Sequence, residues 1–215
     1  MRILSLVSWF KPRWSSLTCW SDYDLCHQLD NPGVVGKNPT FVDFSDCRTT
    51  VDQQRIEAVL DSLDLAGKRL LHVGVGNSGL ALRFHGRCQA IDGLTVAERE
   101  LTRGIGLGLP NYRVHLLNKY SRDFLTTLQP GYDVIVDNNL ASYVCCAFHY
   151  ARMLDHYRWA LAPGGEILTD QRGMGWVVRD QRWRMTYDDL AKVGARFGLQ
   201  SLRVTDDVYA LRRVA

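Results

Sequence analysis

The sequence predicts an α/β fold in which helices cover both faces of a mostly parallel sheet. From residue 67 onward, short apolar runs alternate with amphipathic stretches, and a glycine-rich turn follows the first run. Strands that alternate with helices in this way are typical of βαβ units with right-handed crossovers. The last two apolar runs are separated only by Asp206 and Asp207, which is too short for a parallel crossover. We therefore expect the chain to end in an antiparallel hairpin.

Periodicity and turn residues place each element in order. The first helix is expected over 51–65, where Thr50 and Gln53 form a capping-box pattern and Gly67 follows the end. A second capping box, Thr95 with Glu98, precedes a helix that reaches Gly104. Strands are expected at 70–75, 89–92, 112–117, 132–137, 166–169, 201–205 and 208–214. The other helices are expected from residue 78 and over 120–128, 144–161 and 186–197, the last with Thr186 and Asp189 at its start and Gly198 at its end.

Composition restricts the class of protein. The 215 residues are 46% hydrophobic and 23% charged, which is typical of one globular domain and excludes a disordered, fibrous or small disulfide-stapled chain. The formal charge of +3 is too small to indicate nucleic acid or an anionic membrane as a partner. The apolar N-terminal stretch is too short to span a bilayer and has no cleavage site, so we expect a cytoplasmic protein.

The six cysteines are interpreted as reduced thiols. Cys145 and Cys146 are adjacent, which is a poor arrangement for a structural disulfide framework. No CxxC, HxxxH or HExxH spacing occurs. The motifs therefore predict no metal site.

Polar residues follow four of the predicted strands. The run HVGVGNSG at 72–79 ends the first strand, Asp92 ends the second, Asn118 the third and Asp137 the fourth. Glycines let a ligand approach the backbone, and a carboxylate at the second strand can accept both hydrogens of a ribose diol. Any one of these residues is also typical of a turn or a helix cap. Together they indicate a nucleoside-binding crevice.

These motifs, with the YDVIVD strand, the LAPGGEIL turn and the terminal hairpin, resemble the class I S-adenosylmethionine-dependent methyltransferases over residues 67–215. The resemblance implies a Rossmann-like, seven-stranded sheet with a C-terminal antiparallel hairpin, preceded by an N-terminal helical cap and first helix over 1–66. It implies S-adenosylmethionine as co-substrate, with Asp92 on the ribose and Gly93 and Leu94 beside the adenine. The residues that it places around this molecule are His72, Gly74, Val75, Gly76, Asn77, Ser78, Asp92, Gly93, Leu94, Asn118 and Tyr120.

Two positions depart from the family pattern. His72 stands where the family usually carries an acid that helps to hold the ammonium group, and Ser78 replaces the third glycine. A histidine cannot supply that fixed negative charge, although a packed histidine hydrogen-bonded to the backbone is an equally good interpretation.

The resemblance places the acceptor and catalytic groups after the fourth strand. The predicted residues are Asp137, Asn138, Asn139, Tyr143 and Trp176. Aromatic faces stabilise a sulfonium by cation–π attraction, so Tyr120, Trp14, Trp20 and Tyr23 are further candidates for the pocket wall. Asp137 is not followed by the Pro-Pro-aromatic sequence of enzymes that methylate nucleic-acid bases. This favours a small-molecule acceptor over nucleic acid, and a basic segment with Arg172, Arg179, Arg182 and Arg184 is interpreted as solvated surface.

Methyl transfer is the first expectation, with two alternatives. FLTTLQPGYDVIVD and ILTDQ also resemble aminopropyltransferases, which attack the carbon beside sulfur and release methylthioadenosine. With His72 replacing the acid, the cofactor's own amine could close on its γ-carbon to give azetidine-2-carboxylate, or the carboxyaminopropyl group could be transferred. The second alternative is a non-catalytic cofactor-binding or interaction protein. The partner is then a small molecule, or none beyond S-adenosylmethionine, and the sequence leaves homo-oligomers open.

Overall fold

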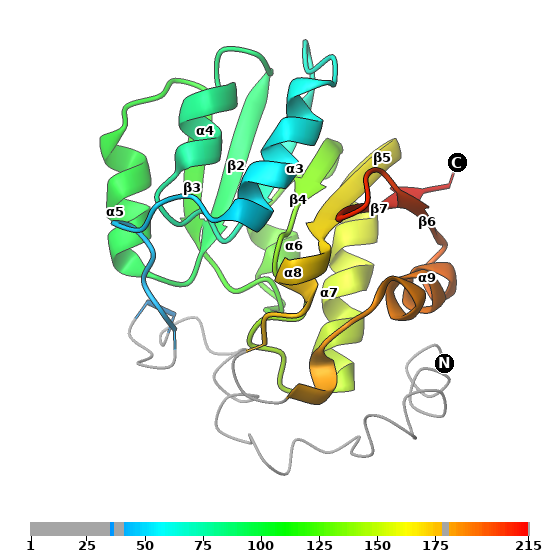
Figure 1. The fold of residues 1–215 in the computed structure, drawn as a ribbon. Coiled ribbons are helices and arrows are strands. Elements are labelled where there is room, and N and C mark those ends of the chain that lie inside the picture. Colours follow the sequence, from blue (N-terminus) through cyan, green and yellow to red (C-terminus); the bar gives the residue numbers. More distant parts are fainter. Residues whose placement is uncertain (1–34, 37–40, 178–180, 215) are drawn as a thin grey trace.

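All seven strands belong to one sheet. The computed structural model describes residues 35–36, 41–177 and 181–214 (Figure 1). The strand order is β3-β2-β1-β4-β5-β7-β6, and the order reverses direction between β1 and β4. The strands are β1 (Arg69–Val73), β2 (Ala90–Thr95), β3 (Tyr112–Leu116), β4 (Tyr132–Val136), β5 (Leu161–Asp170), β6 (Leu199–Arg203) and β7 (Val208–Arg213).

The predicted terminal hairpin is confirmed. β6 pairs with β7 in antiparallel fashion, and β7 inserts between β6 and β5, where it is also antiparallel to its neighbour. The pairs among β1, β2, β3, β4 and β5 are parallel. The carboxyl ends of these five strands therefore lie at one edge of the sheet.

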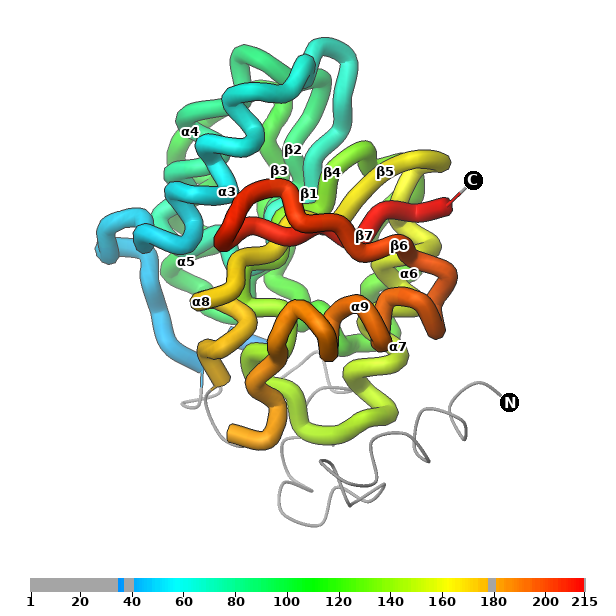
Figure 2. The backbone as a smooth tube through the Cα atoms, turned by 45° about the vertical axis from the view of Figure 1, so that its right-hand side comes forward, coloured from blue at the N-terminus to red at the C-terminus, as the bar shows by residue number. Residues whose placement is uncertain are grey.

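Helices cover both faces of the sheet, as the sequence predicted. They are α3 (Val51–Asp61), α4 (Gly79–Phe84), α5 (Glu98–Gly106), α6 (Phe124–Thr127), α7 (Ala147–Ala160), α8 (Gln171–Met174) and α9 (Tyr187–Arg196), with a 3-10 turn over Gln181–Trp183. Figures 1 and 2 both show α7 and α9 on one side of the sheet, with α3 and α4 on the other.

Alternation of side chains along each strand builds two cores. Leu70 joins the cluster that contains Ile56 of α3 and Phe84 of α4. Its neighbour Leu71 joins the cluster that contains Tyr150 of α7. Because successive side chains of a strand point to opposite faces, each apolar strand contributes to both cores.

Several predicted boundaries and two predicted caps are wrong. The second strand does not end at Asp92 but runs to Thr95, so Thr95 cannot cap the next helix, whose N-cap is Ala97. Thr50 is the N-cap of α3, but its side chain makes no capping hydrogen bond. The helix expected at 120–128 is one turn, Phe124–Thr127. The capping box of the last helix is present, with Thr186 Oγ1 accepting from the Asp189 N–H at 3.3 Å.

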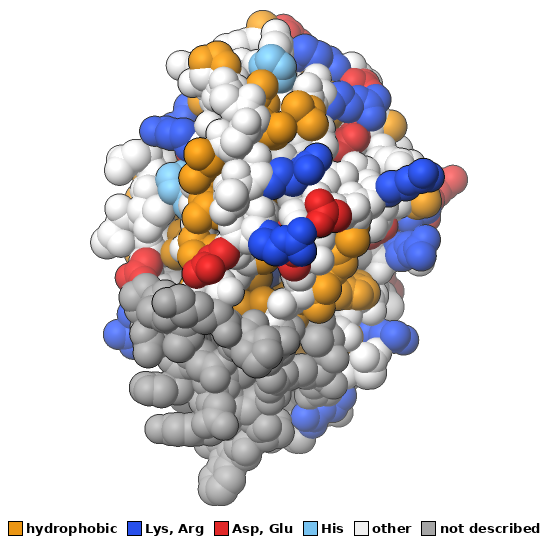
Figure 3. All heavy atoms as spheres, turned by 90° about the vertical axis from the view of Figure 1, so that its left-hand side faces the viewer, with side chains coloured by type: hydrophobic (Ala, Val, Ile, Leu, Met, Phe, Trp, Pro, Cys, Tyr) orange, Lys and Arg blue, Asp and Glu red, His pale blue; other side chains and the backbone are white. Residues whose placement is uncertain are grey.

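Charges are mixed on the part of the surface that Figure 3 shows. Basic and acidic side chains alternate there without a large area of one sign, as the small net charge suggests. No helix within 41–177 and 181–214 is both long and apolar enough to cross a bilayer.

Candidate functional site

A cavity of about 180 Å³ opens at the carboxyl edge of the parallel strands. Its walls come from the segments that follow β1, β2, β3 and β4, and from residues 42–57, which precede the sheet. The cavity lies where the strand order reverses between β1 and β4. Ligands of open α/β sheets bind at such reversals, because the connections there diverge to opposite faces and leave a crevice.

Most of the predicted site residues line this cavity. Those that do are His72, Gly74, Val75, Gly76, Asn77, Leu94, Asn118, Tyr120, Asp137, Asn138, Asn139, Tyr143 and Trp176. Ser78, Asp92 and Gly93 do not line it. Trp14, Trp20 and Tyr23 lie outside the described residues.

The glycine loop after β1 has the backbone that its sequence requires. Gly74 and Gly76 have φ angles of 78° and 50°, which residues with a Cβ adopt at a cost. A Cβ on Gly74 would meet no atom within 4 Å, so the backbone angle and not crowding requires glycine here. Ser78, at φ 58°, is buried below the loop, with its hydroxyl 3.1 Å from the Tyr112 hydroxyl.

Asp92 lies within β2 and faces away from the cavity. Its carboxylate accepts hydrogen bonds from Tyr132 at 2.7 Å and Arg113 at 3.1 Å, and it lies 3.2 Å from His115 Nε2. Burial acts to raise the pKa of Asp92, but the hydrogen bonds from His115 and Tyr132 outweigh it, and the net shift is downward. Placing Asp92 at the strand end was wrong, because pairing with β1 and β3 extends β2 to Thr95.

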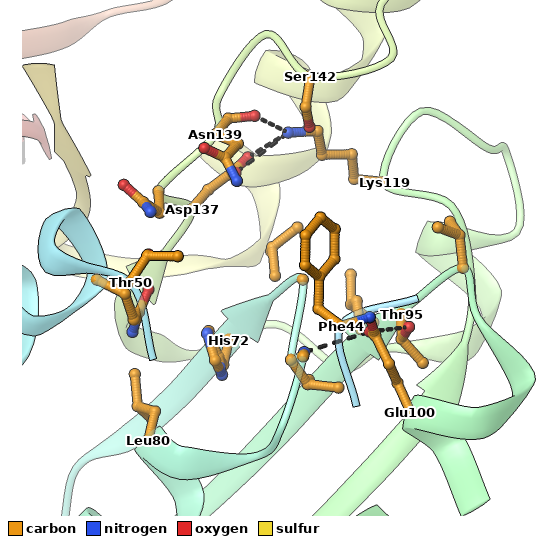
Figure 4. Close-up of a pocket in the computed structure, with 18 of the residues that line it drawn as sticks. Phe44, Thr50, His72, Leu80, Thr95, Glu100, Lys119, Asp137, Asn139 and Ser142 are labelled. Atoms are coloured by element: carbon orange, nitrogen blue, oxygen red, sulfur yellow. Dashed lines mark hydrogen bonds and ion pairs between the residues drawn. The ribbon is translucent and has the colours of Figure 1, made fainter. Parts of the chain in front are cut away.

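Glu100 brings a carboxylate to the cavity beside the end of β2, where we expected the carboxylate of Asp92. It comes from α5, lines the cavity and is 4% exposed. One oxygen accepts from the Thr95 hydroxyl at 2.5 Å and from the Gly76 N–H at 3.2 Å, and the other accepts from the Phe44 N–H at 2.9 Å. Burial raises the pKa of Glu100. Figure 4 shows Glu100 and Thr95 beside Phe44, whose ring projects into the cavity.

A buried ion pair joins the ends of β3 and β4. Lys119 Nζ lies 2.8 Å and 3.1 Å from the two oxygens of Asp137 and also donates to the backbone carbonyls of Asn139 and Leu140 (Figure 4). Tyr157 donates to the same carboxylate at 2.7 Å. Burial lowers the pKa of Lys119, and Asp137 opposes that shift. Asp137 therefore lines the cavity as one half of an ion pair with Lys119. Because Lys119 also binds two backbone carbonyls, the pair is suited to holding the loop after β4 in shape.

His72 contributes a neutral imidazole to the cavity wall. Its side chain is almost fully buried, and its Nδ1 atom has no hydrogen-bond partner among the residues that the structure describes. Burial lowers the pKa of His72 to about 4. The position that carries an acid in the resembling family is thus uncharged here near pH 7.

Aromatic rings form one end of the cavity. Tyr143 and Trp176 meet edge to face with ring centroids 5.7 Å apart, and the ring centroids of Phe44 and Trp176 are 6.3 Å apart. The Tyr143 hydroxyl accepts from the Val42 N–H at 3.1 Å, which ties this wall to the segment before α3. Trp183, from the basic segment, is instead buried against Tyr150.

Phe44, Thr95, Glu100 and Lys119 are among the lining residues that sequence reasoning missed. The sequence does contain a signal for Glu100. If β2 runs to Thr95, the helix that starts at Glu98 brings residue 100 back toward the end of that strand. Lys119 directly follows Asn118, which was predicted, but its pairing with Asp137 depends on β3 and β4 ending at the same edge. The contact of Phe44 with the glycine loop joins residues too far apart in the sequence for a local pattern to indicate.

No protein-family model matches the sequence, and no curated protein is significantly similar to it. Solved structures are similar in fold. The N-methyltransferase NodS from Bradyrhizobium japonicum WM9, in complex with S-adenosyl-L-homocysteine, is 16% identical, with a TM-score of 0.53 over 88% of this chain and 95% of that one. An S-adenosylmethionine-dependent methyltransferase from Mesorhizobium loti is 17% identical, with a TM-score of 0.57 over 79% of this chain and 100% of that one.

A third structure, magnesium protoporphyrin IX methyltransferase from Synechocystis PCC 6803 with bound S-adenosylmethionine, is 11% identical, with a TM-score of 0.55 over 99% of this chain and 97% of that one. At these identities the likeness concerns the fold. The predicted fold is confirmed: the chain has the Rossmann-like fold of the class I methyltransferases.

Proposed function

We propose that this protein is an S-adenosylmethionine-dependent methyltransferase that acts on a small molecule. The observation that carries the proposal is the cavity at the strand reversal, where the backbone of the glycine loop and the buried carboxylate of Glu100 face the same space. The fold alone hosts several functions, so the argument rests on these groups and their placement.

The residues present fit an adenosyl sulfonium compound. Gly74 leaves open space beside the loop backbone, where the amino-acid portion would lie. Glu100 would accept hydrogen bonds from the ribose diol, in place of Asp92, because it is the acid that lines the cavity beside β2. Leu94, Val96 and Leu117 give that end of the cavity an apolar lining suited to a flat base.

The chain contributes chiefly position and exclusion of water. S-adenosylmethionine supplies an activated methyl group on a positively charged sulfur, so the protein needs no covalent step of its own. Holding the acceptor in line with that group converts a bimolecular reaction into a unimolecular one. Tyr143 and Trp176 present aromatic surface that favours a cation, and the paired state of Asp137 avoids an additional free charge in the wall.

A small acceptor suits the form of the cavity. Residues 42–50 lie across the glycine loop, where Asn77 Nδ2 donates to the Cys47 carbonyl at 2.8 Å. Tyr143 and Trp176 narrow the other side. A macromolecular acceptor would need a broad exposed surface around the reacting group, whereas these segments enclose the cavity from two sides.

Calorimetry with S-adenosylhomocysteine tests the cofactor part of the proposal. We expect saturable binding with one site per chain. No heat of binding at millimolar ligand would contradict the proposal and favour the non-catalytic alternative.

Mass spectrometry of the products tests the reaction. In incubations with S-adenosylmethionine and a panel of small amines, hydroxy acids and phenols, we expect S-adenosylhomocysteine together with a product 14 Da heavier than one acceptor. Methylthioadenosine appearing without any acceptor would overturn methyl transfer in favour of attack at the γ-carbon.

A further inference from the structure

Two thiols and an imidazole converge at the start of α7. Cys145 and Cys146 directly precede the helix, and His149 lies in its first turn. The Sγ atoms of Cys145 and Cys146 are 3.8 Å apart, and His149 Nδ1 lies 3.1 Å from the first and 3.4 Å from the second. The spacing of three residues between Cys146 and His149 brings their side chains to the same side of the helix.

The distances match the edges of a tetrahedral metal site. Zinc binds cysteine sulfur at about 2.3 Å and histidine nitrogen at about 2.0–2.1 Å, which for tetrahedral angles sets donor atoms about 3.8 Å (S–S) and about 3.6 Å (S–N) apart. The observed S–S distance matches, and the two S–N distances need only a small outward movement of the ring. A disulfide would require the sulfurs to be about 2.05 Å apart, so this arrangement is that of two reduced thiols.

We propose that Cys145, Cys146 and His149 form a binding site for zinc. Two thiolates and one neutral imidazole are the soft and borderline donors that this ion prefers over magnesium or calcium. Cys146 and His149 are buried, whereas Cys145 is partly exposed and gives the ion a route of entry. The described residues supply three of the four ligands that a zinc ion usually takes.

The proposed site is separate from the cofactor cavity but joined to it by a loop. None of the three residues lines the cavity, whereas Asn138, Asn139, Ser142 and Tyr143 of the preceding loop do. Tyr120 holds that loop by donating to the Ser142 carbonyl at 2.6 Å. A bound ion would fix the other end of the same loop, at the start of α7.

Motif scanning predicts no metal, because it looks for spaced pairs such as CxxC. Here the two adjacent cysteines lie together at the start of α7, where Cys146 is the N-cap and both thiols lie within 3.4 Å of His149 Nδ1 in the first turn. The site does not depend on the proposed methyl transfer, and either can fail without the other.

Titration of the full-length, phosphine-reduced protein with Zn²⁺ and Co²⁺ tests the proposal. We expect one tight zinc equivalent and, with cobalt, a near-ultraviolet charge-transfer band that reports thiolate ligands. Cys145→Ser and Cys146→Ala should each weaken zinc binding by about 100-fold or more, since even loss of an outer-shell partner costs about 10- to 100-fold. Cys88→Ser, at a thiol that donates to the Phe84 carbonyl away from the cluster, is the matched control and should keep wild-type affinity.

Circular dichroism melts establish that each variant is folded. If Cys146→Ala, at the buried position, does not fold, the test uses Cys145→Ser, at the partly exposed position. Zinc should also raise the melting temperature of the wild type, because the folded site holds the three ligands together and binds the ion more tightly than the unfolded chain does. Equal zinc affinity in Cys145→Ser and wild type, or a cobalt spectrum without the thiolate band, would overturn the proposal.

Discussion

At the scale of single residues, two buried carboxylates near β2 have different surroundings. Asp92 sits within the strand among Tyr132, Arg113 and His115, and its side chain does not reach the cavity. Glu100 comes from α5 and meets the glycine loop through the Gly76 N–H. The proposed function therefore assigns the ribose to Glu100, and the two residues serve as test and control for each other.

Glu100→Gln should weaken S-adenosylhomocysteine binding by about 10- to 150-fold. The amide keeps the size of the side chain but loses the charge, and hydrogen bonds to charged groups contribute about 1.5–3 kcal/mol. Calorimetry measures the dissociation constant. Asp92→Asn should change that constant by less than about threefold. The reverse result, with Asp92→Asn the more damaging, would restore the strand residue as the ribose ligand.

Lys119 and Asp137 form a buried pair whose loss should be costly. Their side chains are 7% and 2% exposed, so removing the lysine leaves a carboxylate without its cation. We expect Lys119→Met to lower the free energy of unfolding by about 3–5 kcal/mol in urea titrations.

Lys68→Met is the matched control for that substitution. Lys68 pairs with Asp133 at 3.0 Å, but the two side chains are 47% and 27% exposed, and pairs of this kind contribute about 0–1 kcal/mol. Equal losses in the two variants would show that burial of the Lys119 pair does not matter.

At the scale of elements, similar capping patterns gave different outcomes. Thr186 and Asp189 cap α9 reciprocally, whereas Thr50 precedes α3 without a side-chain cap. The side chain of Gln53, the fourth residue of the first pattern, donates to Glu57 instead, at 3.4 Å. A capping pattern in sequence therefore locates a helix start without guaranteeing the hydrogen bond.

Thr186→Ala should lower the free energy of unfolding by about 1 kcal/mol, the usual cost of a lost N-cap. Thr50→Ala should cost less than about 0.5 kcal/mol, because no capping bond is lost there. Urea denaturation at 25 °C compares the two. A loss for Thr50→Ala as large as that for Thr186→Ala would contradict the assigned caps.

At the scale of the whole molecule, two histidines make stability depend on pH. Burial lowers the pKa of His72 to about 4, and burial followed by the charge of Arg152 lowers the pKa of His156 to about 4. In the unfolded chain each titrates near 6.5. Between pH 6.5 and 4 the unfolded chain therefore binds protons that the folded protein does not, so stability falls as the pH falls.

Each histidine should contribute at most about 1.4 kcal/mol per pH unit to this slope, the value for a difference of one full proton. His72→Asn should make the dependence shallower by somewhat less than that limit between pH 6 and 4.5, measured by urea denaturation at several pH values. An unchanged slope in His72→Asn would mean that its imidazole binds a proton in the folded state.

Local pattern was sufficient for most of the fold. The alternation of apolar runs and helices, the terminal hairpin, the glycine loop and the cap of α9 were all predicted, because period, turn length and backbone preference act within a few residues. Most of the site residues that the same reasoning selected do line the cavity, since parallel strands end at one edge.

Only the tertiary structure decided where β2 ends and which acid faces the cavity. Strand length depends on pairing with neighbours: the N–H groups of Gly74 and Val75 both donate to the Leu94 carbonyl, which carries β2 past Asp92. With β2 extended by three residues, Asp92 lies inside the strand, and its side chain does not line the cavity. Helix α5 turns back toward the strand end, so Glu100 is the acid that lines the cavity there. Lys119 with Asp137 likewise meets through packing that short-range patterns do not contain.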